Sequence, residues 1–250
     1  MTRRTFVIGD VHGDIDQLFT LIGRLPTLTS EDRLVFLGDY VDRGPSSAEV
    51  VEYVRKVLPD ETPAEVIALR GNHEDAWLRV RERGFPEFIM PRSNGALETM
   101  RSYRGEPPPG EDDPPRADEF EDLFGGVFFP PEHLEWFAQL PHWYEDEHAI
   151  YVHAGLPQLD GAFVHPRDVA KKDVLLWLRT ASFFTDYRGK RVVVGHTTTD
   201  CLPQELSAYT PADPMDLWAG EAVTAIDTGC GKGGFLTALE LPALRVYESR

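Results

Sequence analysis

Short apolar runs in the first third of the chain end abruptly in polar turns. The runs at 5–9, 33–38 and 65–71 are rich in Val, Ile, Leu and Phe, and a glycine closes each of them. Runs of this length with glycine at the end predict buried strands rather than helices. Helical patterns separate the runs, and the resulting strand-helix-strand order predicts a parallel sheet.

The segments between these runs carry helical signals. Apolar residues recur at helical spacing over 15–25, and Ser46 with Glu49 resembles a capping box that opens a helix through Val57. Another helix is predicted over 74–83, directly after the third strand. These helices would cover the parallel sheet.

The middle of the chain differs in character from both ends. The stretch 105–119 is proline-rich and acidic, and it lies in a segment around 84–130 that we interpret as a variable loop or lid. A helix is predicted to resume over 132–140. Downstream, five strand-like segments suggest a second sheet; they read AIYVHAG, RVVVGHT, AVTAIDTG, FLTALEL and ALRVYE.

Composition limits the function classes. The chain has 250 residues, and a hydrophobic content of 42% is enough for one large domain over 1–250. A net charge of −17 argues against nucleic acid and anionic membranes as partners. The two cysteines, Cys201 and Cys230, form no CxxC pair, and no long apolar run occurs. We therefore expect a soluble protein of a reducing compartment, the cytoplasm.

Five predicted strands are each followed by a turn that carries potential metal ligands. The turns lie at 9–13, 38–39, 71–74, 152–155 and 195–197. Because ligands collect at the carboxyl ends of strands in open α/β sheets, these side chains can converge there. Carboxylates, an amide and imidazoles without a thiolate suit manganese, iron or zinc in a reactive site better than structural zinc. Two adjacent divalent ions would account for the number of ligands.

Each residue has a simpler interpretation when it is taken alone. Asp10 and Asp39 are compatible with helix-leading turns, and Asn72 with a plain helix cap. Hydrogen-bonded histidines at strand ends are an ordinary feature of folded proteins, and this covers His12, His153 and His196. The conjunction of these residues after five strands favours the metal site.

The ordered motifs GDVHGD, GDYVDRG, GNHE, VHAG and GHT resemble the calcineurin-like metallophosphoesterases of the phosphoprotein phosphatase type. The likeness is greatest to the short bacterial serine/threonine phosphatase branch and its relatives that cleave diadenosine tetraphosphate symmetrically. It spans residues 6 to about 241. The resemblance implies a four-layer α/β/β/α sandwich with a binuclear metal site at the carboxyl ends of the strands.

The resemblance also implies residue roles. One metal ion would be bound by Asp10, His12 and Asp39, and the other by Asp39, Asn72, His153 and His196. His73 matches the general acid and Asp42 the carboxylate that orients it. Arg43 matches a phosphate-binding arginine, Arg179 is a weaker match to a second one, and Asn72 would also contact substrate. Taken from the residues alone, His73 with Asp42 could be a structural pair. Arg43 could form a salt bridge within its loop, and Arg179 could be a solvated arginine on a helix.

These roles agree with known phosphoryl-transfer chemistry. Two metal ions can hold a bridging hydroxide for in-line attack on phosphorus, and arginines complement the charge on the phosphoryl oxygens. The expected function is hydrolysis of phosphoserine and phosphothreonine in proteins, with manganese favoured over iron or zinc. Symmetrical hydrolysis of dinucleoside tetraphosphates is the alternative, and a non-catalytic phosphate-binding module is a third.

The glycine-rich stretch DTGCGKGG around Cys230 needs a separate interpretation. It lacks the GxxxxGK[ST] order of a P-loop, so we interpret it as a β-turn near the site. The tyrosine-bearing loop that eukaryotic members of the phosphatase family have in this region has no counterpart here.

Overall fold

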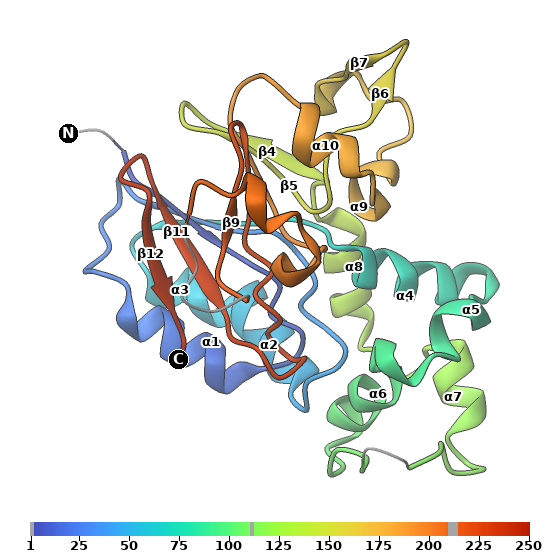
Figure 1. Ribbon diagram of the computed structural model, residues 1–250. Helices are drawn as coiled ribbons and strands as arrows, with labels where there is room; N and C mark the ends of the chain where they lie inside the picture. The colour runs from blue at the N-terminus through green and yellow to red at the C-terminus, as the bar shows by residue number, and fades with distance from the viewer. Residues whose placement is uncertain (1–2, 111–112, 210–214) are drawn as a thin grey trace.

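The computed structural model describes residues 3–110, 113–209 and 215–250. Two five-stranded sheets face each other, and helices cover their outer faces (Figure 1). The first sheet has the order β12-β11-β1-β2-β3, with β1 at Thr5–Ile8, β2 at Arg33–Phe36, β3 at Glu65–Ala68, β11 at Thr237–Leu241 and β12 at Arg245–Glu248. The second has the order β4-β5-β8-β10-β9, with β4 at Trp143–Glu145, β5 at Ile150–Val152, β8 at Val192–Val194, β9 at Trp218–Ala219 and β10 at Val223–Ala225.

Helices occupy both outer layers and a side lobe. The first sheet is covered by α1 (Ile15–Arg24), α2 (Ser47–Glu52), a π-helical turn (Tyr53–Val57) and α3 (Leu58–Glu61). Helices α4 (Asn72–Arg83) and α8 (Pro131–Gln139) pack against each other, and α4 runs from the edge of the sheets towards the lobe (Figure 1). The lobe at the lower right of Figure 1 holds α5 (Pro86–Ile89), α6 (Ala96–Arg104) and α7 (Phe120–Gly125). The second sheet is covered by α9 (Val174–Trp177) and α10 (Ala181–Asp186), beside the hairpin β6 (Gln158–Leu159) and β7 (Ala162–Phe163).

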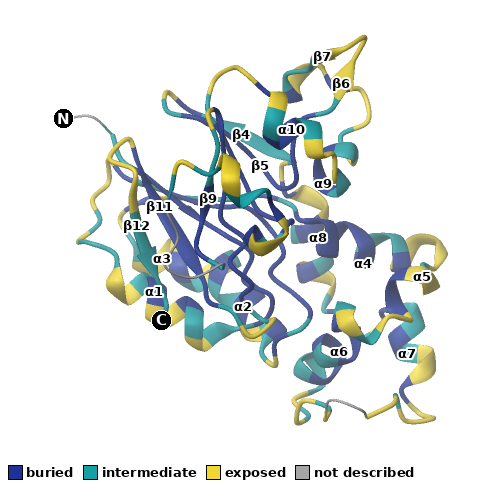
Figure 2. Ribbon diagram, in the orientation of Figure 1, coloured by how far each residue is buried: buried dark blue, intermediate teal, exposed yellow. Residues whose placement is uncertain are grey.

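Side-chain alternation along the strands produces the layers. In β1, Phe6 and Ile8 pack under the helices of the first sheet, whereas Val7 faces the second sheet. In β8, Val193 packs against the first sheet, while its two neighbours face the helices α9 and α10. A strand with a period of two and apolar residues on both faces is buried on both sides. Figure 2 shows these strands as buried, which confirms the predicted α/β/β/α sandwich.

The predicted parallel sheet is confirmed, because β1 pairs in parallel with β2 and β2 with β3. The assignment of all five downstream segments to a second sheet is wrong. Strand β11 pairs antiparallel with β1, and β12 continues that first sheet. Strands β4 and β9, which the sequence did not indicate, complete the second sheet.

Two local predictions also differ from the structure. The side chain of Ser46 makes no capping hydrogen bond. The reciprocal bond of a capping box is also missing, because the Ser46 backbone N–H donates to the Gly13 carbonyl and Glu49 accepts from the Ser102 hydroxyl. The segment 84–130 is not one loop, since α5, α6 and α7 lie within it. Its proline-rich part carries no helix or strand among its described residues, and it is closed by the buried ion pair between Arg101 and Glu119, at 3.0 Å.

A buried carboxylate joins the two sheets at the end where β1 begins. Asp146 accepts hydrogen bonds from the hydroxyls of Thr5 (2.7 Å) and Tyr151 (2.9 Å). It also accepts from the backbone N–H groups of His148 and Ala149. Burial opposes ionisation, but these hydrogen bonds to the carboxylate lower the pKa of Asp146 below its usual value.

The helices also bear on the expectation that no membrane is involved. Within the part of the chain that the structure describes, none of them combines the length and the apolar character needed to span a bilayer.

Candidate metal centre and phosphate pocket

The five polar turns meet at one edge of the two sheets. Asp10 and His12 follow β1, Asp39 follows β2, and Asn72 begins α4 after β3. From the second sheet, His153 follows β5 and His196 follows β8. Several of these turns adopt the left-handed conformation without glycine, including His12 (φ 46°), Asp39 (φ 55°) and His196 (φ 65°). Backbone strain of this kind clusters at functional sites, where the surrounding structure imposes it.

Two compact groups of ligand atoms share Asp39. The first joins His12, Asp39 and His73, and the second joins Asp39, His153 and His196. In each group the ligand atoms lie within 4.8 Å of one another, and every side chain is buried. Asp10 lies beside the first group, with its Oδ2 3.9 Å from Nε2 of His12. Shared use of one carboxylate is the arrangement that a bridged pair of metal ions requires.

Lone pairs face each other in the second group. Nδ1 of His153 lies 2.9 Å from the Leu37 carbonyl, which can only accept a hydrogen bond, so Nδ1 carries the proton. Nε2 of the neutral ring therefore presents a lone pair, and it lies 2.8 Å from the amide oxygen of Asn72. Two acceptors at this distance repel each other unless a cation lies between them. His196 places Nδ1 2.7 Å from the same oxygen, and its buried Nε2 has no hydrogen-bond partner among the described residues.

In the first group, too, an imidazole directs an unprotonated nitrogen towards the other ligand atoms. Nδ1 of His12 lies 3.0 Å from the Val41 carbonyl, so its Nε2 is the unprotonated nitrogen. That atom lies 3.5 Å from Oδ2 of Asp39 and contacts the guanidinium of Arg43. The converging donors are carboxylate oxygens, an amide oxygen and imidazole nitrogens, which fit divalent ions such as manganese, iron or zinc.

The electrostatics of the cluster favour bound cations. Burial, together with the charges of Asp227 and Asp39, raises the pKa of Asp10 well above its usual value. Burial also raises the pKa of Asp39, but the surrounding histidines outweigh it and hold that pKa well below the usual range. Burial and the charge of Arg43 lower the pKa of His12 well below its usual value. A neutral His12 and an ionised Asp39 are the protonation states that metal ligands need, and a bound cation would favour the ionised form of Asp10 as well.

His73 of the first group forms a buried pair with Asp42. Nδ1 of His73 lies 2.6 Å from Oδ2 of Asp42, and its Nε2 lies 3.8 Å from Asp39. Two residues that the sequence did not single out fix Asp42: Thr99 donates from its hydroxyl at 2.6 Å, and Trp77 donates from its indole N–H at 3.0 Å. The motif pattern gave no signal for Trp77.

Glu74 is a further residue to which the sequence assigned no role. Its buried carboxylate accepts hydrogen bonds from the backbone N–H groups of Asp39, Tyr40 and Gly71, all within 2.9 Å. Burial and the nearby charge of Asp39 raise the pKa of Glu74 to about 8. Glu74 thereby ties the turn after β2 to the start of α4. Gly71 is needed there, because a Cβ would lie 2.1 Å from Oδ1 of Asp39.

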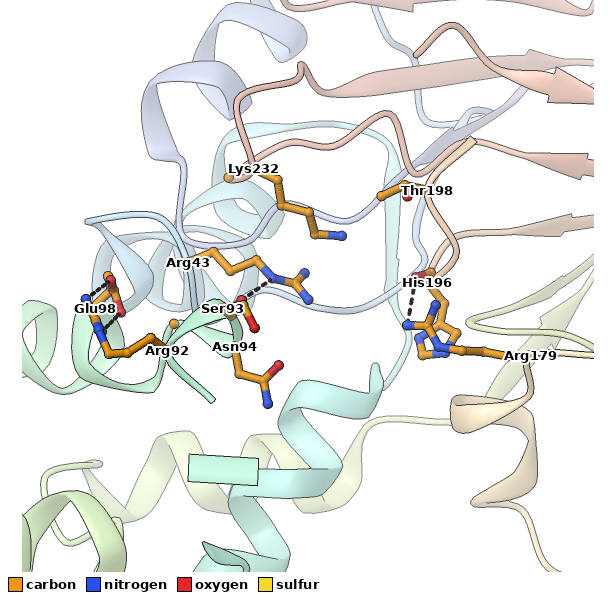
Figure 3. Close-up of a pocket in the computed structure, with 11 residues that line it drawn as sticks. Arg43, Arg92, Ser93, Asn94, Glu98, Arg179, His196, Thr198 and Lys232 are labelled. Atoms are coloured by element: carbon orange, nitrogen blue, oxygen red, sulfur yellow. Dashed lines mark hydrogen bonds and ion pairs between the residues drawn. The ribbon is translucent and has the colours of Figure 1, made fainter. Parts of the chain in front are cut away.

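A polar pocket of about 510 Å³ opens beside the cluster (Figure 3). Arg43 and Arg179 both line it, together with His196. Arg43 is held by the Ser93 carbonyl and Arg179 by the His196 carbonyl, at 3.4 and 3.5 Å. Arg92 also lines the pocket, but its guanidinium is paired with Glu98. The pocket thus presents unneutralised arginines next to the candidate ligands.

Comparison with curated proteins finds relatives of two kinds. A Caenorhabditis elegans protein named "Putative serine/threonine-protein phosphatase" is 48% identical over 71 residues, which cover 27% of this chain and 18% of that protein. A symmetrical bis(5'-nucleosyl)-tetraphosphatase of Coxiella burnetii is 30% identical over 160 residues, which cover 62% of this chain and 43% of that protein. The chain therefore spans less than half the length of these relatives.

Comparison with solved structures and with family models gives the fold and the family. The metallophosphoesterase of Sphaerobacter thermophilus superimposes with a TM-score of 0.55 at 19% identity, covering 98% of this chain and 87% of that one. The model of the calcineurin-like phosphoesterases matches residues 3–200. This match covers most of the chain and includes all the turns that carry the candidate ligands. The chain therefore belongs to the calcineurin-like phosphoesterase family.

Proposed function

We propose that this protein is a divalent-metal-dependent phosphatase that hydrolyses phosphoserine and phosphothreonine in proteins. The observation that carries this proposal is the buried His73–Asp42 pair, in which Nδ1 of His73 contacts Asp42 and Nε2 of His73 lies 3.8 Å from Asp39, the carboxylate that both ligand groups share. A proton donor, anion-binding groups and metal ligands are the parts that phosphomonoester hydrolysis requires. The similarity to the phosphatase of Caenorhabditis elegans supports the choice of a protein substrate.

In this proposal, the metal ions are held by the residues of the cluster. The two sets are Asp10, His12 and Asp39, and Asp39, Asn72, His153 and His196. When bound, the two ions supply positive charge to the phosphoryl oxygens and activate the attacking water. Manganese is the ion that we propose, with iron and zinc as the other ions that these ligands suit.

Side chains of the protein bind the phosphoryl group and protonate the leaving group. The guanidinium groups of Arg43 and Arg179 bind the phosphoryl oxygens, where negative charge accumulates in the transition state. The water oxygen forms a bond to phosphorus while the ester P–O bond breaks. Nε2 of His73 gives its proton to the leaving alkoxide, and Asp42 holds the ring in the required tautomer and stabilises its charged form.

A second candidate function is symmetrical hydrolysis of a dinucleoside tetraphosphate. One observation favours it: the pocket carries cationic side chains beyond the two arginines that a single phosphoryl group needs. The similarity to the Coxiella burnetii hydrolase supports the same chemistry.

The test removes metal with a chelator, restores manganese, and offers a phosphothreonyl peptide and diadenosine tetraphosphate separately. Orthophosphate released from the peptide, with little ADP from the dinucleotide, is the expected result. The reverse pattern would replace the proposal with the second candidate. Turnover that persists in the chelated protein would contradict the metal dependence.

A further inference from the structure

The turn that joins β10 to β11 contributes a lysine to the phosphate pocket. Residues 229–234 form this turn, and Lys232 lines the pocket together with Arg43 and Arg179. In Figure 3, Lys232 projects from its own loop, above Arg43 and on the side away from Asn94. The proposed reaction gives Lys232 no role, because Arg43, Arg179 and the metal ions already account for the phosphoryl group that is hydrolysed.

The turn is fixed against the first ligand-bearing loop. A Cβ at Gly231, where φ is +71°, would lie 2.6 Å from the Cβ of His12, so only glycine allows this approach. The thiol of the next residue towards the N-terminus, Cys230, donates to the Val11 carbonyl at 3.1 Å. The position of Lys232 is therefore set by the same loop that presents Asp10 and His12.

A buried carboxylate holds the lysine in place. Nζ of Lys232 lies 3.1 Å from Oδ2 of Asp227, and the other oxygen of Asp227 accepts from the Gly229 backbone N–H at 3.1 Å. The side chain of Asp227 is completely buried, whereas that of Lys232 is 24% exposed. An ammonium group has three N–H donors, and Asp227 is the partner found for it among the described residues. The remaining donors are available to a ligand in the pocket.

The pocket has room and charge for more than one phosphate group. Its volume of about 510 Å³ lies in the range that holds a complete small-molecule ligand. Arg92 also lines the pocket, but two of its nitrogens are bound to Glu98. Lys232, in contrast, has one contact among the described residues, with Asp227, and keeps N–H donors for a ligand beside Arg43 and Arg179. Resting on the proposed phosphatase function, we propose that Lys232 binds a second phosphate group of the substrate, adjacent to the one that is hydrolysed, and so selects substrates with two or more phosphates.

Binding of phosphonates that cannot be hydrolysed tests this proposal on the manganese-loaded protein. The probes are methylphosphonate, with one anionic group, and methylenediphosphonate, with two. We expect Lys232→Met to weaken binding of the diphosphonate about tenfold, because a hydrogen bond to a charged group is lost, and to leave binding of the monophosphonate within about twofold. Lys232→Arg should restore most of the loss, because it restores the charge.

Lys190→Met is the matched control. Lys190 is also a partly exposed lysine paired with a carboxylate, Glu145 at 2.9 Å, but it lies outside the pocket. It should change neither affinity. Equal losses for both probes in Lys232→Met, or no loss for the diphosphonate, would overturn the proposal. These titrations need no turnover, so a failure of the proposed phosphatase function, visible as no hydrolysis by the wild-type protein, is read separately.

Kinetics then identify the source of the second phosphate group. KM is measured for a singly and a doubly phosphorylated peptide and for diadenosine tetraphosphate, with wild-type protein and Lys232→Met. An increase in KM confined to the doubly phosphorylated peptide supports a neighbouring phosphoresidue, and one confined to the dinucleotide supports a polyphosphate chain. A fall in kcat with unchanged KM for every substrate would contradict a binding role.

Discussion

Buried carboxylates lie at both ends of the sheet sandwich, but the two ends treat them differently. At the end where β1 begins, hydroxyl and backbone donors surround Asp146 and lower its pKa. At the opposite end, Asp10 faces Asp227 and Asp39, and its pKa is raised. The first arrangement stabilises the fold by itself. The carboxylates around Asp10 repel each other until positive charge is added. This end of the sandwich therefore lowers the stability of the metal-free fold while favouring a bound cation.

The largest expected effect is a loss of catalytic rate without a loss of stability, caused by a substitution at the candidate metal centre. His73→Asn removes the proposed proton donor, so kcat should fall by about 10² to 10⁴ with a leaving group that needs a proton. Bound manganese, measured by elemental analysis, and the melting temperature should stay close to those of the wild-type protein. Unchanged turnover would exclude His73 as the acid.

At the end of the sandwich that holds Asp146, substitution should change stability and not catalysis. Asp146→Ala leaves the hydroxyls of Thr5 and Tyr151 without their acceptor and should cost about 3 kcal/mol of unfolding free energy, measured by urea denaturation. Turnover per folded molecule should not change. Asp118→Ala, in which an exposed carboxylate is removed, is the control and should cost less than about 0.5 kcal/mol. A loss as small for Asp146→Ala would undo the contrast between the two ends.

Removing the charge of Asp10, in contrast to removing Asp146, should increase the free energy of unfolding of the metal-free protein. Asp10→Asn keeps a side-chain acceptor for the backbone N–H of His196 but removes a charge that Asp227 and Asp39 oppose. The metal-free variant should therefore be more stable than metal-free wild-type protein by about 1 kcal/mol at pH 8. Calorimetry of both proteins after chelation measures this. Destabilisation instead would show that Asp10 is satisfied in the metal-free state.

A smaller effect on kcat is expected from substituting Trp77, which contacts Asp42, the partner of the proposed acid His73. Trp77→Phe removes the indole N–H that donates to Asp42 but keeps an aromatic ring in the core. The loss of about 1 kcal/mol of support for the carboxylate should lower kcat about fivefold, with KM unchanged. A change in KM alone would argue that Trp77 acts on the pocket and not through Asp42.

The last prediction concerns pH and the buried imidazoles. Burial lowers the pKa of His153, and burial with the charge of His153 lowers that of His196. The unfolded chain therefore binds more protons than the folded one below the ordinary histidine pKa of about 6.5. The melting temperature of the metal-free protein should fall as pH decreases below 6.5. Bound manganese should reduce this dependence, and equal slopes with and without metal would contradict it.

Local sequence patterns predicted much of the molecule. Each apolar run that ends in Gly-Asp or Gly-Asn became a strand followed by a turn, because short-range sterics and burial decide that outcome. The structure also brings the predicted ligands and His73 to one edge. The pairing of β11 with β1 could not be predicted, since local periodicity says nothing about which distant strand a segment will join.

Local sequence patterns could not predict the residues that hydrogen-bond to the site residue Asp42. Asp42 lies in a loop, and it is held by Trp77 from α4 and by Thr99 from α6. The sequences around Trp77 and Thr99 look like ordinary amphipathic helices. The capping box at Ser46 failed for a related reason, because a distant carbonyl, that of Gly13, takes the backbone N–H. Tertiary contacts overrode the local preference in each case.

The return of β11 to β1 has a consequence for synthesis on the ribosome. Phe6 is paired with Glu240, so one edge of β1 has no partner strand until nearly the whole described chain has been translated. Until then, β1 presents open backbone donors and acceptors within an otherwise formed half-sheet. Such an edge recruits other strands, and chaperone dependence during translation should therefore fall mainly on the first sheet.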